Sequence, residues 1–205
     1  MESLAFAESV NWDSFSHIAL ACKDGSWNLS DPLLVVEWFD SKVKRHGEQL
    51  RRICRYLKAW RDYQWSSGGP SSIVLMVCAA QTLDRSNVVF EARDDLALNH
   101  VLKSLPNQLL DSVTEAMINP DEDLNRLNND DRELAANRAS VFQCHLNQAL
   151  TMDIASVSTG IRLIQNHLGE RFPLDPQGVI DTPHSIRTIP VEPRPRQTIH
   201  STKAG

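Results

Sequence analysis

Residues 50–61 read LRRICRYLKAWR, and residues 71–80, after a Gly68-Gly69-Pro70 break, read SSIVLMVCAA. In the first stretch apolar residues recur every three or four positions, which is the spacing of one face of an α-helix. The predicted apolar stripe consists of Leu50, Ile53, Cys54, Leu57 and Trp60. In the second stretch the apolar run continues as Cys-Ala-Ala, which favours a buried helix over a buried strand. We therefore predict an amphipathic helix, a glycine-proline turn and a central helix.

Further helices are predicted on both sides of this pair. Ser30-Asp31-Pro32 is a typical helix start, and the helix that follows should end at Gly47. Downstream, helices are predicted over residues 94–105, 106–119, 132–152 and 154–168, with an acidic connector at residues 120–131. In the long helix, Leu134, Val141, Phe142, His145 and Leu146 are expected on or near one face. Because no convincing strand pattern occurs between residues 30 and 170, the fold class is all-α, a bundle of about six to seven helices.

The chain divides into three parts by composition. Residues 1–29 contain Trp12, Phe15 and Trp27 but no sustained periodicity, so an irregular segment is predicted there. Residues 30–172 form the helical domain. Residues 173–205 are rich in proline and arginine, which predicts a flexible tail outside the packed core.

Charge and hydropathy limit the classes of function that fit the sequence. The chain has 205 residues, 41% of them hydrophobic, and a formal net charge of −5, so bulk electrostatics favour neither nucleic acid nor an anionic membrane. The start of the chain resembles no secretory signal, since Glu2 and Glu8 stand where basic residues would be needed. The longest apolar run, residues 73–80, is too short to cross a bilayer. A cytoplasmic protein without membrane partners is expected.

The cysteines indicate a reducing compartment. The chain contains Cys22, Cys54, Cys78 and Cys144, which are far apart and include no CxxC pair. Cys54 and Cys78 lie within apolar helical patterns, so buried free thiols are predicted rather than a disulfide framework or a zinc site.

A candidate phosphate-binding row lies on the amphipathic helix. At about 100° per residue, Arg51, Arg55 and Lys58 share a face opposite the apolar stripe. Such a row is also typical of a solvated cationic surface. Ser71 and Ser72 directly precede the central helix, where free amides and hydroxyls suit a phosphate oxygen, although serines there also serve as ordinary caps. Together the two features suggest a basic helix beside a helix N-terminus.

The chain resembles the bacterial cGAS/DncV-like nucleotidyltransferases over about residues 17–178. The stretches that carry the resemblance are Ser30-Asp31-Pro32 with Trp38-Phe39, residues 50–52, residues 56–62, Pro70-Ser71-Ser72-Ile73, Asn119-Pro120, residues 123–127, Leu168-Gly169 and residues 171–173. Members of this family have a nucleotidyltransferase lobe with a Gly-Ser loop and three metal-binding acids, and a helical lobe that closes the nucleotide cleft. They join nucleoside triphosphates into cyclic oligonucleotides, the second messengers of anti-phage defence.

Only the helical lobe of that family is matched. Gly25-Ser26 lacks a following Asp-x-Asp strand, and the Asp-x-Asp of Asp121 and Asp123 lies in the connector. The resemblance therefore implies a truncated or split enzyme, inactive alone, whose first 29 residues are a remnant of the inter-lobe segment. No metal or cofactor is expected on this chain alone; Mg²⁺ with ATP or GTP is implied for the complete enzyme.

The resemblance also assigns residues and partners. Lys58 matches the lysine that contacts the donor triphosphate, and Ser72, or its neighbour Ser71, matches a serine that contacts the same nucleotide; Arg51 and Arg55 are added from the helical wheel. The expected partners are nucleoside triphosphates, a separate catalytic lobe and, through Gly205, a ubiquitin-transfer-like conjugating enzyme. The alternative is that Gly205 is an ordinary chain terminus that is not conjugated. A helical protein-interaction module is the rival function, and direct nucleic-acid binding is disfavoured by the acidic net charge.

Overall fold

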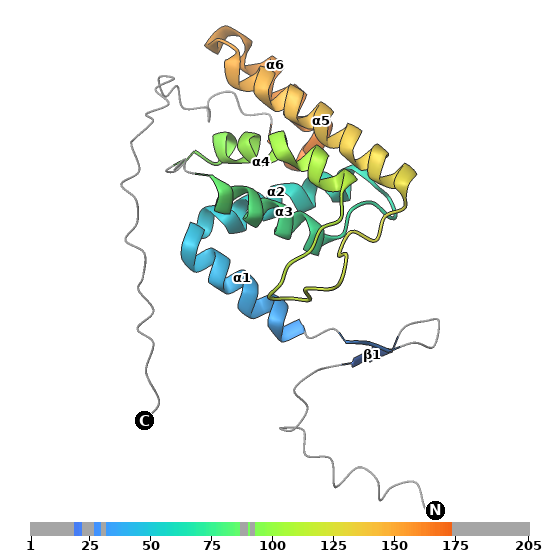
Figure 1. The fold of residues 1–205 in the computed structure, drawn as a ribbon. Coiled ribbons are helices and arrows are strands. Elements are labelled where there is room, and N and C mark those ends of the chain that lie inside the picture. Colours follow the sequence, from blue (N-terminus) through green and yellow to red (C-terminus); the bar gives the residue numbers. More distant parts are fainter. Residues whose placement is uncertain (1–18, 22–26, 30–31, 87–89, 91–92, 174–205) are drawn as a thin grey trace, which may run out of the picture.

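A computed structural model describes residues 19–21, 27–29, 32–86, 90 and 93–173 of the chain (Figure 1). Several positions singled out from the sequence lie outside these residues. They are Glu2, Glu8, Trp12, Phe15, Cys22, Gly25, Ser26, Ser30, Asp31, the segment 174–205 and its last residue Gly205, together with the side chain of Trp27.

Six α-helices make up most of the described chain, and a short antiparallel ribbon precedes them (Figure 1). The strands are β1, Ala19–Ala21, and β2, Trp27–Leu29; the helices are α1, Pro32–His46, α2, Glu48–Gln64, α3, Ser72–Arg85, α4, Asp94–Leu110, α5, Asn129–Thr151, and α6, Val157–Leu168; 3₁₀ turns cover Ile154–Ser156 and Gly169–Arg171. The predicted all-α class is confirmed. The ribbon, which pairs Ala19 with Leu29, falls in the segment predicted to be irregular and is too short to show a strand pattern in the sequence.

The first three helices form as the sequence predicts. Gly47 joins α1 to α2 with a φ of 73°, a left-handed conformation that favours glycine, and its N–H donates to the Val43 carbonyl over 2.7 Å. Every residue of the predicted apolar stripe on α2 is buried. On α3 the buried residues are Val74, Leu75, Val77, Cys78, Ala79, Ala80, Thr82 and Leu83. Burial on nearly all sides makes α3 the central helix.

An aromatic column connects α2 to the α5–α6 pair. The Trp60 ring meets Trp65 edge-on, with 5.1 Å between centroids, and stacks on Phe142 of α5 at 6.3 Å. Phe142 in turn stacks on His167 of α6 at 4.6 Å. His145 lies beside His167, with 2.8 Å between Nδ1 of the former and Nε2 of the latter. These rings therefore join three helices that are far apart in the sequence.

The predicted helix break at Pro106 is wrong. Helix α4 continues through Pro106 to Leu110, and no helix follows over residues 111–119, where the chain forms turns and an isolated bridge between Glu115 and Asn119. A proline inside a helix removes one backbone hydrogen bond and crowds the preceding turn. Burial of Leu105 and Leu109 on either side of the proline holds the last turns in the helix.

The buried face of α5 also differs from the prediction. Leu134 and Val141 are 41% and 42% exposed. The buried positions are Ala135, Ala136, Ala139, Phe142 and Leu146. Alanines on this face let α5 approach α4 closely, and the larger side chains at Leu134 and Val141 point to the surface.

Two of the cysteines are buried free thiols, as predicted. Cys54 and Cys78 are buried and unbonded, and burial raises the pKa of each thiol to about 12. They are inert core residues, whereas Cys144 is exposed. Among the described helices, none combines the length and the apolarity needed to cross a membrane.

Candidate functional site

The predicted cationic row on α2 divides into two parts. Arg55 is exposed and Lys58 is half-buried, one turn further along the helix. Arg51 is directed to α1: its guanidinium pairs with the Asp40 carboxylate at 2.9 Å and lies 5.4 Å from the centre of the Phe39 ring. An arginine held this way already has a counter-ion, so Arg51 is the least available of the three for an added anion.

The start of α3 is a capped helix N-terminus. Ser71 is the N-cap, and its hydroxyl accepts a hydrogen bond from the Val74 N–H over 3.4 Å. Gly69 has a φ of 75°, and Pro70 is buried, so the turn before the cap is tightly placed. Ser71 therefore performs the ordinary capping role that was the alternative to ligand binding, and Ser72 occupies the first helical position.

A third side chain, Arg61, connects the two elements. Its Nη2 donates to the Ser72 hydroxyl over 3.3 Å. Arg61 lies three residues after Lys58 on α2, a spacing that puts the two side chains on neighbouring positions of one helix face. Helix α2 thus contacts the first turn of α3 through Arg61, a residue outside the predicted row of Arg51, Arg55 and Lys58.

The end of α2 is fixed by contacts from α5 and α6. Arg138 of α5 donates to the Gln64 carbonyl, and its guanidinium lies 4.5 Å from the centre of the Trp65 ring. The Gln64 side chain donates to the Asn166 carbonyl of α6 over 3.1 Å. These contacts hold the helix that carries Lys58 and Arg61 against the bundle.

The charges at the start of α3 favour the binding of an anion. A helix N-terminus carries partial positive charge on its free amides, and the cations of α2 add to it. The Asp62 carboxylate lies 2.7 Å from Arg61 Nε and offsets part of that charge. Asp62 is 53% exposed and therefore well solvated, which weakens this offset.

Sequence reasoning placed Lys58, Ser72 and Ser71 near one another but missed Arg61. The signal was present, because Arg61 follows Lys58 at the i, i+3 spacing that puts two side chains on one helix face. What the sequence could not supply was the direction of the α3 start relative to α2. Among the described residues, no three His, Cys, Asp or Glu side chains lie close enough to hold a metal ion.

Comparison with known proteins assigns the chain to a family. Residues 47–179 match the family described as "Cyclic GMP-AMP synthase, C-terminal domain". A cyclic GMP-AMP synthase of Escherichia coli (strain TW11681) is 39% identical over 107 residues, which are 51% of this chain and 24% of that protein. The chain thus spans about a quarter of that curated relative.

Solved structures of the same family are also similar to this chain. A crystal structure of Vibrio cholerae DncV cyclic AMP-GMP synthase with the linear intermediate 5′ pppA(3′,5′)pG has a TM-score of 0.66 at 30% identity over 76% of this chain and 41% of that one. The 3′-deoxy GTP bound form of Escherichia coli DncV also has a TM-score of 0.66, at 28% identity over 77% of this chain and 43% of that one. The resemblance seen in the sequence motifs is confirmed: this chain belongs to the cyclic GMP-AMP synthase family and contains its C-terminal helical domain.

Proposed function

We propose that the helical domain binds the triphosphate of a nucleoside triphosphate, as the helical lobe of a cyclic-oligonucleotide synthase of anti-phage defence. The observation that carries the proposal is the contact between Arg61 and Ser72, which joins the cationic face of α2 to the start of α3. The relatives support it, since one DncV structure holds a linear triphosphate intermediate and another a 3′-deoxy GTP. We propose that the protein acts in the cytoplasm.

Each residue of the proposed site has a distinct role. Lys58 supplies a point charge on a flexible stem, which suits a triphosphate whose oxygens have no fixed geometry. The Ser72 hydroxyl accepts from Arg61, so its own proton is free to be donated to a phosphate oxygen. Arg55 and, more weakly, Arg51 add charge along the approach to the site.

Binding and chemistry are divided between two lobes in this proposal. Phosphoryl transfer with two metal ions needs carboxylates that hold both ions. We assign these carboxylates, and with them Mg²⁺, to the nucleotidyltransferase lobe that the family resemblance implies, carried on the same polypeptide or on a separate one. The residues of the present chain then bind and orient the nucleotide, and the chain by itself is expected to form no cyclic product.

Calorimetric titration with ATP and with GTP tests the binding role. Lys58→Ala should weaken binding by about tenfold, because one charge-assisted contact to phosphate is lost. Lys103→Ala removes an exposed lysine from α4 and serves as the matched control, which should bind like the parent. Equal heats for the Lys58→Ala variant and the parent would remove Lys58 from the site, and no heat with the parent would overturn the proposal for this chain.

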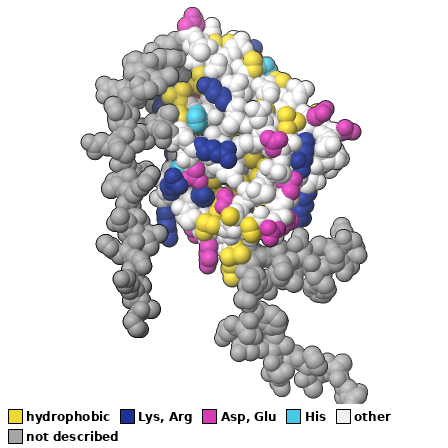
Figure 2. Space-filling model, in the orientation of Figure 1, with side chains coloured by type: hydrophobic (Ala, Val, Ile, Leu, Met, Phe, Trp, Pro, Cys, Tyr) yellow, Lys and Arg dark blue, Asp and Glu magenta, His cyan; other side chains and the backbone are white. Residues whose placement is uncertain are grey.

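A protein-interaction module is the second candidate. Leu33 and Val36 lie one turn apart on α1 and are 63% and 56% exposed. Figure 2 shows hydrophobic side chains gathered at the lower end of the molecule, where α1 begins. Exposed apolar residues that share a helix face are typical of an interface. A folded monomer that ignores ATP and GTP in the titration would favour this reading.

A further inference from the structure

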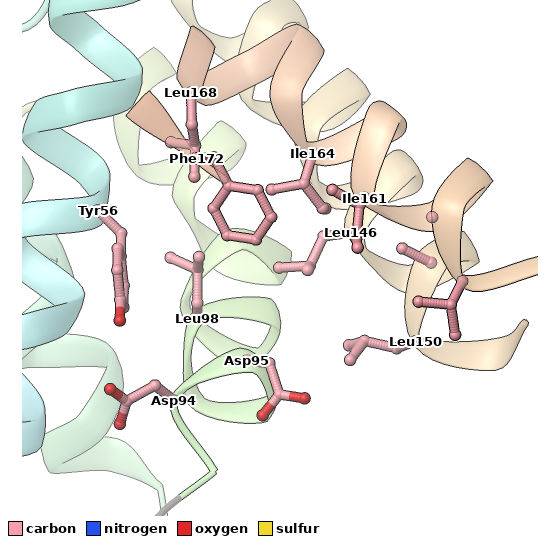
Figure 3. Close-up of a pocket in the computed structure, with 13 residues that line it drawn as sticks. Tyr56, Asp94, Asp95, Leu98, Leu146, Leu150, Ile161, Ile164, Leu168 and Phe172 are labelled. Carbon is pink, nitrogen blue, oxygen red and sulfur yellow. The ribbon is translucent and has the colours of Figure 1, made fainter. Parts of the chain in front are cut away.

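A cavity of about 290 Å³ lies between α4 and the α5–α6 pair, with α2 closing one side. Most of the residues that line it are apolar: Leu98, Leu146, Ala149, Leu150, Val157, Gly160, Ile161, Ile164, Leu168 and Phe172, together with Tyr56, Asp94 and Asp95. In Figure 3 the aliphatic side chains of α5 and α6 face Tyr56 and Leu98 across the space, and Phe172 lies among them. The volume is at the lower end of the range for small-molecule sites.

One end of the cavity is polar. Asp94 and Asp95 open helix α4, and Figure 3 shows both carboxylates at the same end, with the Tyr56 hydroxyl directed toward Asp94. The hydrogen bond from Arg52 is the main reason that the pKa of Asp94 is low. Burial is the largest single influence on Asp95 and acts to raise its pKa, but the hydrogen bond and charge of Arg93, together with backbone hydrogen bonds, lower that pKa overall. Both groups are therefore charged at neutral pH.

The two carboxylates differ in exposure: the Asp94 side chain is 18% exposed and the Asp95 side chain is 39% exposed. Asp94 accepts two bonds from Arg52, at 2.5 and 2.9 Å, and one from Gln49 at 3.1 Å. Asp95 accepts two bonds from Arg93, its neighbour two residues away, at 2.9 and 2.7 Å, and both side chains are more than a third exposed. Because each carboxylate oxygen can accept more than one hydrogen bond, the more exposed Asp95 can accept a further bond from an added cation while it stays paired with Arg93.

We propose that this cavity is a binding site for a small organic cation, a molecule with an apolar body and a protonated amine. The apolar body fills the space between Leu98 and the α5–α6 pair, where it removes hydrocarbon surface from water. The amine donates to the Asp95 carboxylate at the polar end. The site is separate from the proposed triphosphate site, because Tyr56 and Lys58 point to opposite sides of α2, about 200° apart on the helix.

Phenethylamine is a suitable probe, with phenethyl alcohol as its neutral counterpart and hydrocinnamate as its anionic one. In a titration of the full chain followed by side-chain methyl NMR, phenethylamine should shift the signals of Leu98, Ile161 and Ile164. The alcohol should bind about fivefold more weakly, since it lacks the charge. Hydrocinnamate should bind more weakly still, because its carboxylate faces Asp95. Equal affinity for all three probes, or no shift with the amine, would overturn the proposal.

Two variants test the Asp95 charge and the cavity volume separately. Asp95→Asn should abolish the preference for the amine over the alcohol, and Val157→Phe, which places a larger side chain at the cavity wall, should weaken both. Asp130→Asn, an exposed acid in the first turn of α5, is the matched charge control and should bind like the parent. Thermal melting of each variant establishes that it is folded. An Asp95→Asn variant that keeps the full preference for the amine would contradict the role of the carboxylate.

Discussion

The guanidinium of Arg61 donates to the Ser72 hydroxyl over 3.3 Å, from the last turn of α2 to the first residue of α3. Because this bond orients the hydroxyl, Arg61→Gln should weaken ATP binding by about tenfold and should remove most of the further effect of Ser72→Ala. A double-mutant cycle by calorimetry measures this coupling. Arg85→Gln, at the other end of α3, is the control and should bind ATP like the parent. Additive effects of the two changes would show that Arg61 does not act through Ser72.

The two adjacent serines should respond differently to truncation. Ser71 caps α3, so Ser71→Ala should lower the free energy of unfolding by about 1 kcal/mol with little change in ATP binding. Ser72→Ala should weaken ATP binding while stability stays within about 0.5 kcal/mol. Denaturant unfolding and calorimetry on the same two proteins provide the comparison. The opposite assignment of the two losses would make Ser71 the nucleotide ligand.

The buried His167 predicts a loss of stability in acid. Burial, and then the neighbouring His145, lower the pKa of His167 from 6.5 to about 4. The unfolded chain therefore binds a proton that the folded chain excludes, and stability falls as the pH drops from about 6.5 toward about 4, by at most about 1.4 kcal/mol per pH unit. Urea unfolding across this range should show a shallower pH dependence for His167→Gln than for the parent. Parallel curves would mean that His167 does not contribute to it.

Two neighbouring glycines offer a test of the turn before α3. Gly68 and Gly69 both have a left-handed φ, 77° and 75°, so alanine at either position is strained by about 1 kcal/mol. A Cβ on Gly68 would meet nothing within 4 Å, whereas one on Gly69 would lie 2.8 Å from the ring of Trp65. Trp65 is held between Trp60 and Arg138 and cannot move aside easily.

Gly69→Ala should therefore lower the free energy of unfolding by about 1–3 kcal/mol more than Gly68→Ala. It should also weaken ATP binding, because the turn leads directly to Ser71 and Ser72. Chemical unfolding and calorimetry of the two variants check both expectations. Equal stability of the two variants would mean that Trp65 yields to the added methyl group.

The parts of the fold that follow local rules were predictable. The Gly47 stop and the three- and four-residue spacing on α2 each encode their structure within a few residues. Pro106 and Leu134 mark where this fails, because their structure depends on partners. Buried neighbours carry α4 past the proline, and the alanines of α5 are buried because they face α4.

The candidate site, too, could be predicted from the sequence only in part. Helical periodicity could group the cations on α2. It could not show that Arg51 turns to Asp40 on α1, or that Arg61 reaches Ser72, because both contacts depend on how two helices are oriented in three dimensions.

The contacts at the end of α2 have a mechanical consequence. Gln64 receives a hydrogen bond from Arg138 of α5 and donates one to Asn166 of α6, while the aromatic column joins the same three helices. Helix α2 therefore has no independent hinge at this end, and its backbone cannot shift without moving α5 and α6 as well. In the proposed binding mode, the helical domain is therefore the fixed side of the nucleotide site, and a closing motion is expected from the catalytic lobe that we assign to the other side.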